Sequence, residues 1–162
     1  MTPSASPEEL DLFRTLKVLV VDDSAEMRRL LLALLAAMNI GGVICARSGE
    51  TGLKLFAEEH PDLIITDGAM QPMDGYEMTR RIRAGEANAN VPILMISGHI
   101  GHEHITQARD DGITDYIAKP VTPELLYERV RAAVSTPIHI VRTQNYCGLS
   151  PVRRLTAHVA RG

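Results

Sequence analysis

Short apolar runs alternate with longer amphipathic stretches between residues 17 and 134. The short runs are continuous and rich in Val, Ile and Leu, which is typical of parallel strands buried on both faces. The pattern indicates an α/β fold in which a parallel sheet carries helices on both faces. It predicts strands at 17–21, 42–46, 62–66, 91–96 and 114–118, and helices at 25–38, 50–59, 75–84, 102–110 and 123–134.

The first and last of these helices have clear local signals. Ser24 and Thr122 precede them and are residue types that cap helix N-termini. The first helix carries apolar residues at helical spacing, which we expect to face the core: Met27, Leu30, Leu31, Leu34 and Met38.

Both ends of the chain differ from this alternating region. Residues 1–15 read as a polar leader with a short helical turn around Pro7–Phe13, and residues 16–135 as the domain itself. Residues 136–162 hold prolines, scattered apolar residues and the basic pair Arg153–Arg154, and they are too few for an independent domain. We expect a C-terminal tail or docking segment there, with a disordered extension as the alternative.

Composition excludes several classes of function. The net charge is −3 and aromatic residues make up 4% of the chain, so neither a basic surface nor stacking platforms favour nucleic-acid binding. The apolar runs are too short for a membrane span, and the N-terminus lacks the features of a signal peptide. Two cysteines, Cys45 and Cys147, fit neither a disulfide framework nor a zinc pattern. A cytoplasmic location is therefore the default expectation.

Polar side chains follow the ends of four predicted strands. Asp22 and Asp23 follow the first strand, Asp67 the third, Ser97 the fourth and Lys119 the fifth. Because the carboxyl ends of parallel strands meet at one edge, where open α/β sheets bind ligands, we expect these side chains to converge.

These residue types suit phosphoryl chemistry with a metal ion. Mg²⁺ prefers oxygen ligands, and Asp22, Asp23 and Asp67 supply carboxylates whose mutual repulsion a divalent cation relieves. Asp67 is then a candidate nucleophile that forms an aspartyl phosphate. Lys119 would place a positive charge on a phosphoryl oxygen, and Ser97 could donate a hydrogen bond to another. A cis bond between Lys119 and Pro120 is one way to fix that turn.

These motifs together resemble the receiver domain of two-component response regulators, over about residues 16–135. The resemblance rests on Val18 to Ser24, on Asp67 with the loop to Gly75, on Ser97–Gly98, and on Tyr116 to Pro120. It implies the flavodoxin-like strand order 2-1-3-4-5. It also implies that Asp67 accepts a phosphoryl group from a phosphohistidine of a sensor histidine kinase or a histidine phosphotransfer protein, with Mg²⁺ on Asp22, Asp23 and Asp67 and the backbone carbonyl of Ala69 as a further candidate ligand.

The resemblance further implies a switch pair, Ser97 and Tyr116, and an output through phosphorylation-dependent binding of another protein. Such a protein is not a conventional enzyme, since it catalyses only its own phosphorylation and dephosphorylation. The sequence departs from the family where Ala69 and His99 flank the expected phosphoryl site, and where Gln71 displaces the usual proline by one place to Pro72.

Two other functions stay open from the sequence. The first is an aspartate-based phosphohydrolase of small metabolites, which would want a second aspartate where Ala69 stands. The second is a receiver that acts only as a scaffold. This alternative is disfavoured because the chain keeps the full set of acids, Ser97 and Lys119. The group His99, His102 and His104 suggests a metal site, but its spacing fits no common zinc pattern, and a polar loop with a first helical turn is favoured.

Overall fold

The computed structural model describes residues 5–136, 138, 140–144, 147–149, 155 and 157–161. In these residues the helices are α1 (Pro7–Thr15), α2 (Ala25–Ala37), α3 (Gly49–Glu59), α4 (Gly75–Ala84), α5 (His102–Asp111) and α6 (Pro123–Ser135). The strands are β1 (Lys17–Val21), β2 (Gly42–Ala46), β3 (Leu63–Asp67), β4 (Ile93–Ser97), β5 (Asp115–Ala118), β6 (Ile140–Arg142), β7 (Cys147–Leu149) and β8 (Ala157–His158).

The central sheet has six parallel strands in the order β2-β1-β3-β4-β5-β8. The expected order 2-1-3-4-5 is confirmed, and β8 adds a strand that the sequence did not predict. Asp67 pairs with Ile96 and Ser97 with Ala118, so the carboxyl ends of β3, β4 and β5 lie level at one edge.

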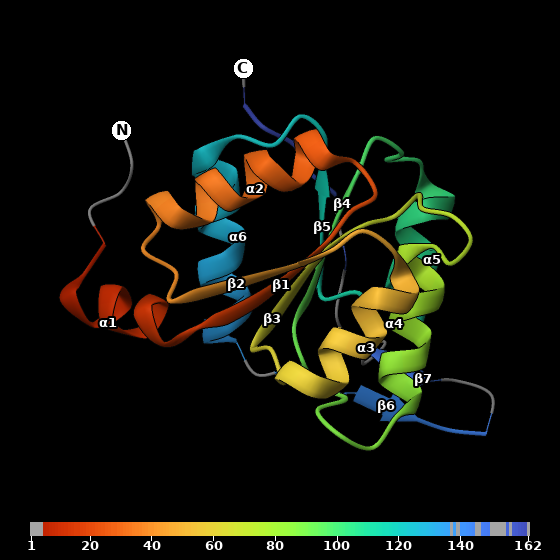
Figure 1. Cartoon of the computed structure of the whole chain (residues 1–162). Coiled ribbons are helices and arrows are strands. Elements are labelled where there is room, and N and C mark those ends of the chain that lie inside the picture. The colour runs from red at the N-terminus through yellow and green to blue at the C-terminus, as the bar shows by residue number, and fades with distance from the viewer. Residues whose placement is uncertain are drawn as a thin grey trace.

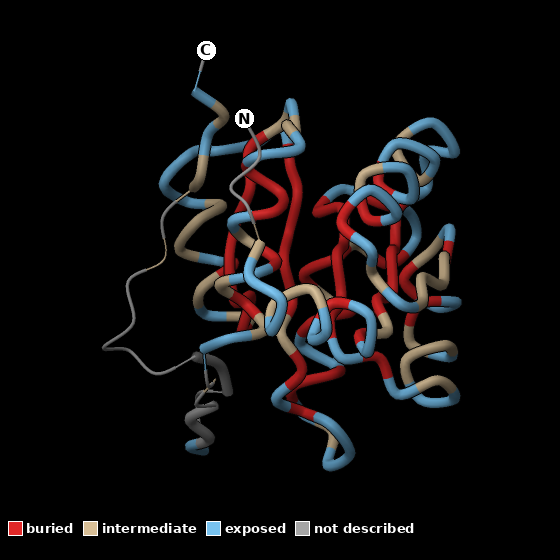
Figure 2. The backbone as a smooth tube through the Cα atoms, turned by 90° about the vertical axis from the view of Figure 1, so that its left-hand side faces the viewer, coloured by how far each residue is buried: buried red, intermediate tan, exposed pale blue. Residues whose placement is uncertain are grey.

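Helices cover both faces of this sheet, as expected. Figure 1 shows α2 and α6 on one side and α3, α4 and α5 on the other. Successive residues of β1 point to opposite layers, with Val18 and Val20 in the α2–α6 core and Leu19 and Val21 in the α3–α5 core. Figure 2 shows the resulting buried strands in the middle of the molecule. The strands are continuously apolar in sequence because both faces of the sheet are buried under helices.

All ten predicted strands and helices are present, and their bounds either match the prediction or shift by one or two residues. Ser24 and Thr122 cap α2 and α6 through their side chains, as expected. The strand β3 includes Asp67 itself, and β4 runs to Ser97 after starting two residues later than predicted. The expected inward stripe of α2 was wrong at Leu30, which is exposed, whereas Leu35 is fully buried. Because leucines occur on more than one side of α2, the helical repeat of 3.6 residues does not by itself decide which of them face the core.

The N-terminal segment folds as a nine-residue helix, longer than the expected turn. A capping box between Ser6 and Glu9 starts α1, which satisfies two of its first backbone N–H groups. Phe13 is buried against the edge of the Tyr127 ring at 5.7 Å between centroids, and Glu9 pairs with Arg131 at 3.1 Å. The description of this segment as a polar leader was therefore wrong at Phe13, which belongs to the core. The domain boundary at residue 16 stays a prediction.

Phe13→Ala should destabilise the protein by about 3 kcal/mol or more, because it empties a fully buried aromatic site. Urea unfolding followed by circular dichroism measures this. Leu12→Ala is the matched control on the same helix, since Leu12 is 39% exposed. Equal losses in the two variants would contradict the packing of α1 on α6.

The described part of the C-terminal segment folds back on the domain. β6 and β7 form an antiparallel pair, β7 lies beside α4 and α5, and β8 joins the edge of the main sheet. Tyr146, Arg153 and Arg154 lie outside the described residues. The described residues thus form the docked alternative rather than the disordered one.

Candidate functional site

Three carboxylates meet at the carboxyl edge of the sheet. Asp22 follows β1, Asp23 is next to it, and Asp67 ends the neighbouring strand β3. One ligand oxygen from each lies within 4.8 Å of the others. Asp22 and Asp67 are buried and Asp23 is exposed, so the cluster has an inner and a solvent side. Among the described residues this is the one group of three acids, histidines or cysteines with the geometry to hold a metal ion.

Asp22 is fixed by its neighbours but is electrostatically strained. The backbone N–H of Ser24 donates to Asp22 Oδ1 at 2.8 Å, and Arg28 Nη1 donates to the Asp22 carbonyl at 2.7 Å. Burial raises the pKa of the Asp22 carboxyl, and the negative charges of Asp67 and Asp23 raise it further, against the lowering effects of the Ser24 bond and Lys119. A bound cation would remove this cost, which makes the position suitable for a metal.

Asp22→Asn should stabilise the metal-free protein by about 0.5–2 kcal/mol while it weakens metal binding. The amide keeps an acceptor for the Ser24 N–H but removes a buried negative charge from beside Asp67. Thermal unfolding in EDTA and a Mg²⁺ titration measure the two effects. A variant that unfolds more easily in EDTA would show that Asp22 is not held under repulsion.

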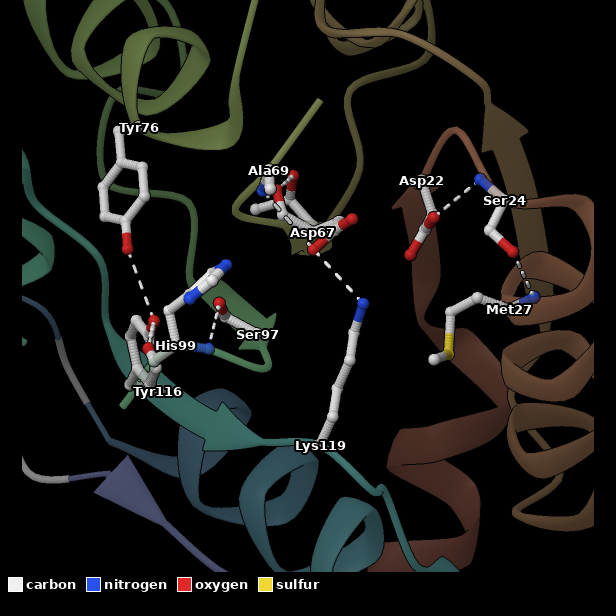
Figure 3. A network of polar contacts seen from close by, with 11 residues as sticks. Asp22, Ser24, Met27, Asp67, Ala69, Tyr76, Ser97, His99, Tyr116 and Lys119 are labelled. Atoms are coloured by element: carbon white, nitrogen blue, oxygen red, sulfur yellow. Dashed lines mark hydrogen bonds and ion pairs between the residues drawn. The ribbon is translucent and has the colours of Figure 1, made fainter. Parts of the chain in front are cut away.

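Asp67 is held by groups from two directions, as Figure 3 shows. Lys119 Nζ donates to Asp67 Oδ1 at 3.4 Å, and the backbone N–H of Ala69 donates to the same oxygen at 3.5 Å. Gly75 passes so close behind the strand that a Cβ atom there would lie 2.1 Å from the Asp67 carbonyl oxygen. Only glycine fits this close approach, so the start of α4 presses directly on the end of β3.

Lys119 is positioned by the turn after β5. Its backbone N–H donates to the Ser97 carbonyl at 2.9 Å, which ties this turn to the end of β4. The bond to Pro120 is cis, as we considered from the sequence, and Gln71–Pro72 is a second cis bond that we did not predict. Asp67 and Lys119 are far apart in sequence but lie in contact, because β3 and β5 end at the same edge of the sheet.

Ser97 begins a chain of hydrogen bonds that leads away from the acids (Figure 3). Its Oγ accepts from the His99 backbone N–H at 3.1 Å, and the His99 carbonyl accepts from the Tyr116 hydroxyl. The Tyr116 and Tyr76 hydroxyls lie 3.3 Å apart. Because the Tyr116 hydroxyl donates its hydrogen bond to the His99 carbonyl, Tyr76 is the donor in the hydrogen bond between the two tyrosines. Burial raises the pKa of Tyr76, and the Tyr116 hydrogen bond adds to this, so the proton stays in place.

A cavity of about 290 Å³ lies beside this chain of hydrogen bonds, between α4 and α5. It is lined by Gly68, Ala69, Asp74, Tyr76, Ser97, His99, His104 and Gln107. It therefore connects the loop after Asp67 with the segment after Ser97.

The structure brings together the acids and Lys119 as the sequence suggested, and it adds residues that sequence reasoning missed. Tyr76 and Arg28 had no local signal in the sequence, because each lies within an ordinary helix. Tyr76 contacts Tyr116, which is distant in sequence, and Arg28 donates to the backbone carbonyl of Asp22. His99 and His104 lie with ring centroids 5.3 Å apart, and the histidines at 99, 102 and 104 form no metal-binding group of three. No helix in the described residues is long and apolar enough to cross a membrane.

A parallel sheet of this strand order, with three carboxylates and a lysine at its carboxyl edge, defines a flavodoxin-like domain built to handle a phosphoryl group. A family model described as "Response regulator receiver domain" matches residues 18–131, which is more than half of the chain. The chain belongs to this family.

The chain is similar to several chemotaxis proteins, and it covers nearly the whole length of each. The chain is 34% identical to chemotaxis protein CheY1 of Helicobacter pylori over 122 residues, covering 75% of this chain and 98% of the relative. It is 31% identical to chemotaxis protein CheY of Pseudomonas aeruginosa, over 71% of this chain and 93% of the relative. The structure of CheY4 from Vibrio cholerae superposes with a TM-score of 0.69 at 29% identity, over 73% of this chain and 98% of that one. A putative response regulator from Chloroflexus aurantiacus gives a TM-score of 0.71, also at 29% identity, over 75% of this chain and 98% of that one.

The chain therefore carries a CheY-like receiver that signals through a phospho-aspartate in the pocket of Asp22, Asp23 and Asp67, and it is not a conventional enzyme. This acidic cluster is typical of the metal site of receivers. Family membership also implies a histidine kinase as a partner. The phosphohydrolase and scaffold alternatives lose their support with this assignment.

Proposed function

We propose that Asp67 is the phosphoacceptor and that Mg²⁺ binds Asp22, Asp23 and Asp67, with the Ala69 carbonyl as a further ligand. The observation that carries the proposal is the contact between Lys119 Nζ and Asp67 Oδ1 beside the acidic cluster. Both hydrogen bonds that described residues make to the Asp67 carboxylate go to Oδ1.

The transfer itself is a displacement at phosphorus. An Asp67 oxygen forms a bond to phosphorus while the bond to the donor histidine nitrogen breaks, and that nitrogen keeps the electron pair and later takes up a proton. Bound Mg²⁺ would neutralise charge on the carboxylates and the phosphoryl oxygens. Lys119 moves from Asp67 Oδ1 to a phosphoryl oxygen. The Ser97 hydroxyl donates a hydrogen bond to another phosphoryl oxygen.

The donor in this proposal is a sensor histidine kinase or a histidine phosphotransfer protein, acting in the cytoplasm. The output is binding to another protein through the face made by α5, β5 and α6, controlled by Ser97 and Tyr116. Support comes from the chain of hydrogen bonds that joins Ser97, through His99, to Tyr116. If Ser97 turns toward a phosphoryl group, the bond that it accepts from His99 has to change, and the change reaches Tyr116.

Incubation with acetyl phosphate tests the phosphoryl chemistry without a kinase. We expect the intact protein to gain one phosphoryl group in Mg²⁺, to gain none in EDTA, and to lose the group in hydroxylamine, as an acyl phosphate does. Labelling that is independent of Mg²⁺ would contradict the metal site. A label that resists hydroxylamine would contradict an aspartyl phosphate.

A further inference from the structure

The strand β8 lies outside the part of the chain that matches the receiver family, which ends at residue 131. It pairs in parallel with β5, where Tyr116 is opposite Ala157 and Ile117 is opposite His158. Without β8, β5 would be the edge strand of the sheet, with unpaired backbone groups. The chain thus covers with its own C-terminal segment the strand that carries the proposed switch tyrosine.

One face of β8 is held by polar contacts. His158 Nε2 contacts Asp115 Oδ1 at 2.8 Å, and Arg129 Nη1 of α6 contacts Asp115 Oδ2 at 3.1 Å. Both oxygens of one largely buried carboxylate are therefore used to join β5, α6 and β8. Arg161 lies beyond β8 and, with Glu124 and Glu128 of α6, lines a groove of about 600 Å³. The opposite charges in this groove favour docking of residues 157–161 on α6.

Two apolar residues of this segment lie on the side of the sheet that holds Tyr116. Ala157 is next to His158 in β8, so its side chain points to the opposite face, and Leu155 comes shortly before the strand. Both pack against the core cluster that contains Tyr116, and the Tyr116 ring is 0% exposed. Tyr116 is already in an inward position in this structure, with its hydroxyl on the His99 carbonyl. In the proposed switch, a phosphoryl group on Asp67 draws Ser97 toward itself and favours this inward position of Tyr116.

We propose that β8 acts as a clamp that holds Tyr116 inward, so that docking of β8 and loading of Asp67 reinforce each other. The proposal rests on the Ser97–Tyr116 switch of the proposed function. Ala157 is the register partner of Tyr116, and both Leu155 and Ala157 pack against its cluster, so outward rotation of Tyr116 would disturb this packing. Since two ligands that favour the same conformation raise each other's affinity by the same factor, a loaded Asp67 also tightens β8.

The clamp also defines the surface that a partner meets. In the docked state the output face is built from α5, β8 and α6, and not from a bare β5 edge. The partner then contacts residues outside the part of the chain that matches the family, such as Val159, which is 55% exposed.

Two pairs of variants of the full chain test the clamp. Leu155→Asp places a charge against the Tyr116 cluster, and Leu30→Asp is its control because Leu30 is 42% exposed on α2. His158→Ala removes the contact with Asp115, and His102→Ala is its control on the exposed start of α5. Beryllofluoride with Mg²⁺ serves as the phosphoryl analogue. Amide hydrogen exchange of the β8 peptide and the beryllofluoride dissociation constant are measured for each protein.

We expect Leu155→Asp and His158→Ala to speed β8 exchange and to weaken beryllofluoride binding about fivefold or more, a typical size for coupling between sites. Both controls should stay within about twofold of wild type, and beryllofluoride should slow β8 exchange in wild type. Variants that release β8 but bind beryllofluoride as wild type does, or more tightly, overturn the clamp. Variants that leave β8 protected overturn the contacts assigned to it. Failure of wild type to bind beryllofluoride at all overturns the proposed function and the clamp with it.

Discussion

Asp67→Asn should abolish formation of the acyl phosphate. The amide has almost the shape of the carboxylate but lacks an anionic oxygen, so it is a very poor nucleophile toward phosphorus. It also leaves Lys119 without the negative partner that lies 3.4 Å away. The expected result is no detectable gain of a phosphoryl group from acetyl phosphate in Mg²⁺, measured by intact mass.

The loss should not come from unfolding. Asp67→Asn removes one of the charges that repel Asp22, so the variant should keep its circular dichroism spectrum and unfold no more easily than wild type. Asp11→Asn is the matched control, since Asp11 is an exposed residue of α1 that pairs with Arg14 at the surface. Hydroxylamine-sensitive labelling that survives in Asp67→Asn would move the phosphoacceptor to another carboxylate and refute the assignment.

The acidic part of the site could be predicted because the topology of a parallel sheet determines where the residues after each strand lie. Once continuous apolar runs are interpreted as parallel strands, the polar residue after each run is assigned to the same edge. Asp22, Asp67 and Ser97 follow from this rule alone, and the structure places them at the ends of β1, β3 and β4. The contact of Lys119 with Asp67 needed the strand order as well, and that came from the family resemblance.

The parts that could not be predicted have little periodic signal. β8 consists of Ala157 and His158 only, shorter than the runs of four or more residues from which a strand can be recognised. Its residue His158 contacts Asp115 and Arg129, which are distant in sequence. The burial of Phe13 likewise depends on Tyr127 of the last helix. Contacts of this kind are decided by tertiary packing, so a reading of local pattern misses them.

Lys119→Arg should slow phosphorylation by acetyl phosphate about tenfold or more although it keeps the positive charge. Lys119 Nζ is a compact charge at the end of a chain whose length brings it to Asp67 Oδ1, beside the place where a phosphoryl oxygen would lie. A guanidinium is a wider planar group on a different stem, and the side chain is fixed at its base by the bond from the Lys119 N–H to the Ser97 carbonyl. The larger group therefore cannot occupy the same position without a shift of the turn.

Comparison of three variants separates charge from geometry. Lys119→Arg and Lys119→Ala should both lose most of the initial rate, whereas Lys54→Arg, at an exposed position of α3, should label at the wild-type rate. If Lys119→Arg keeps the wild-type rate and only Lys119→Ala loses it, a diffuse positive charge is sufficient and the point contact with the phosphoryl group is wrong. If all three label as wild type does, Lys119 takes no part in the transfer, and its contact with Asp67 only balances charge in the resting protein.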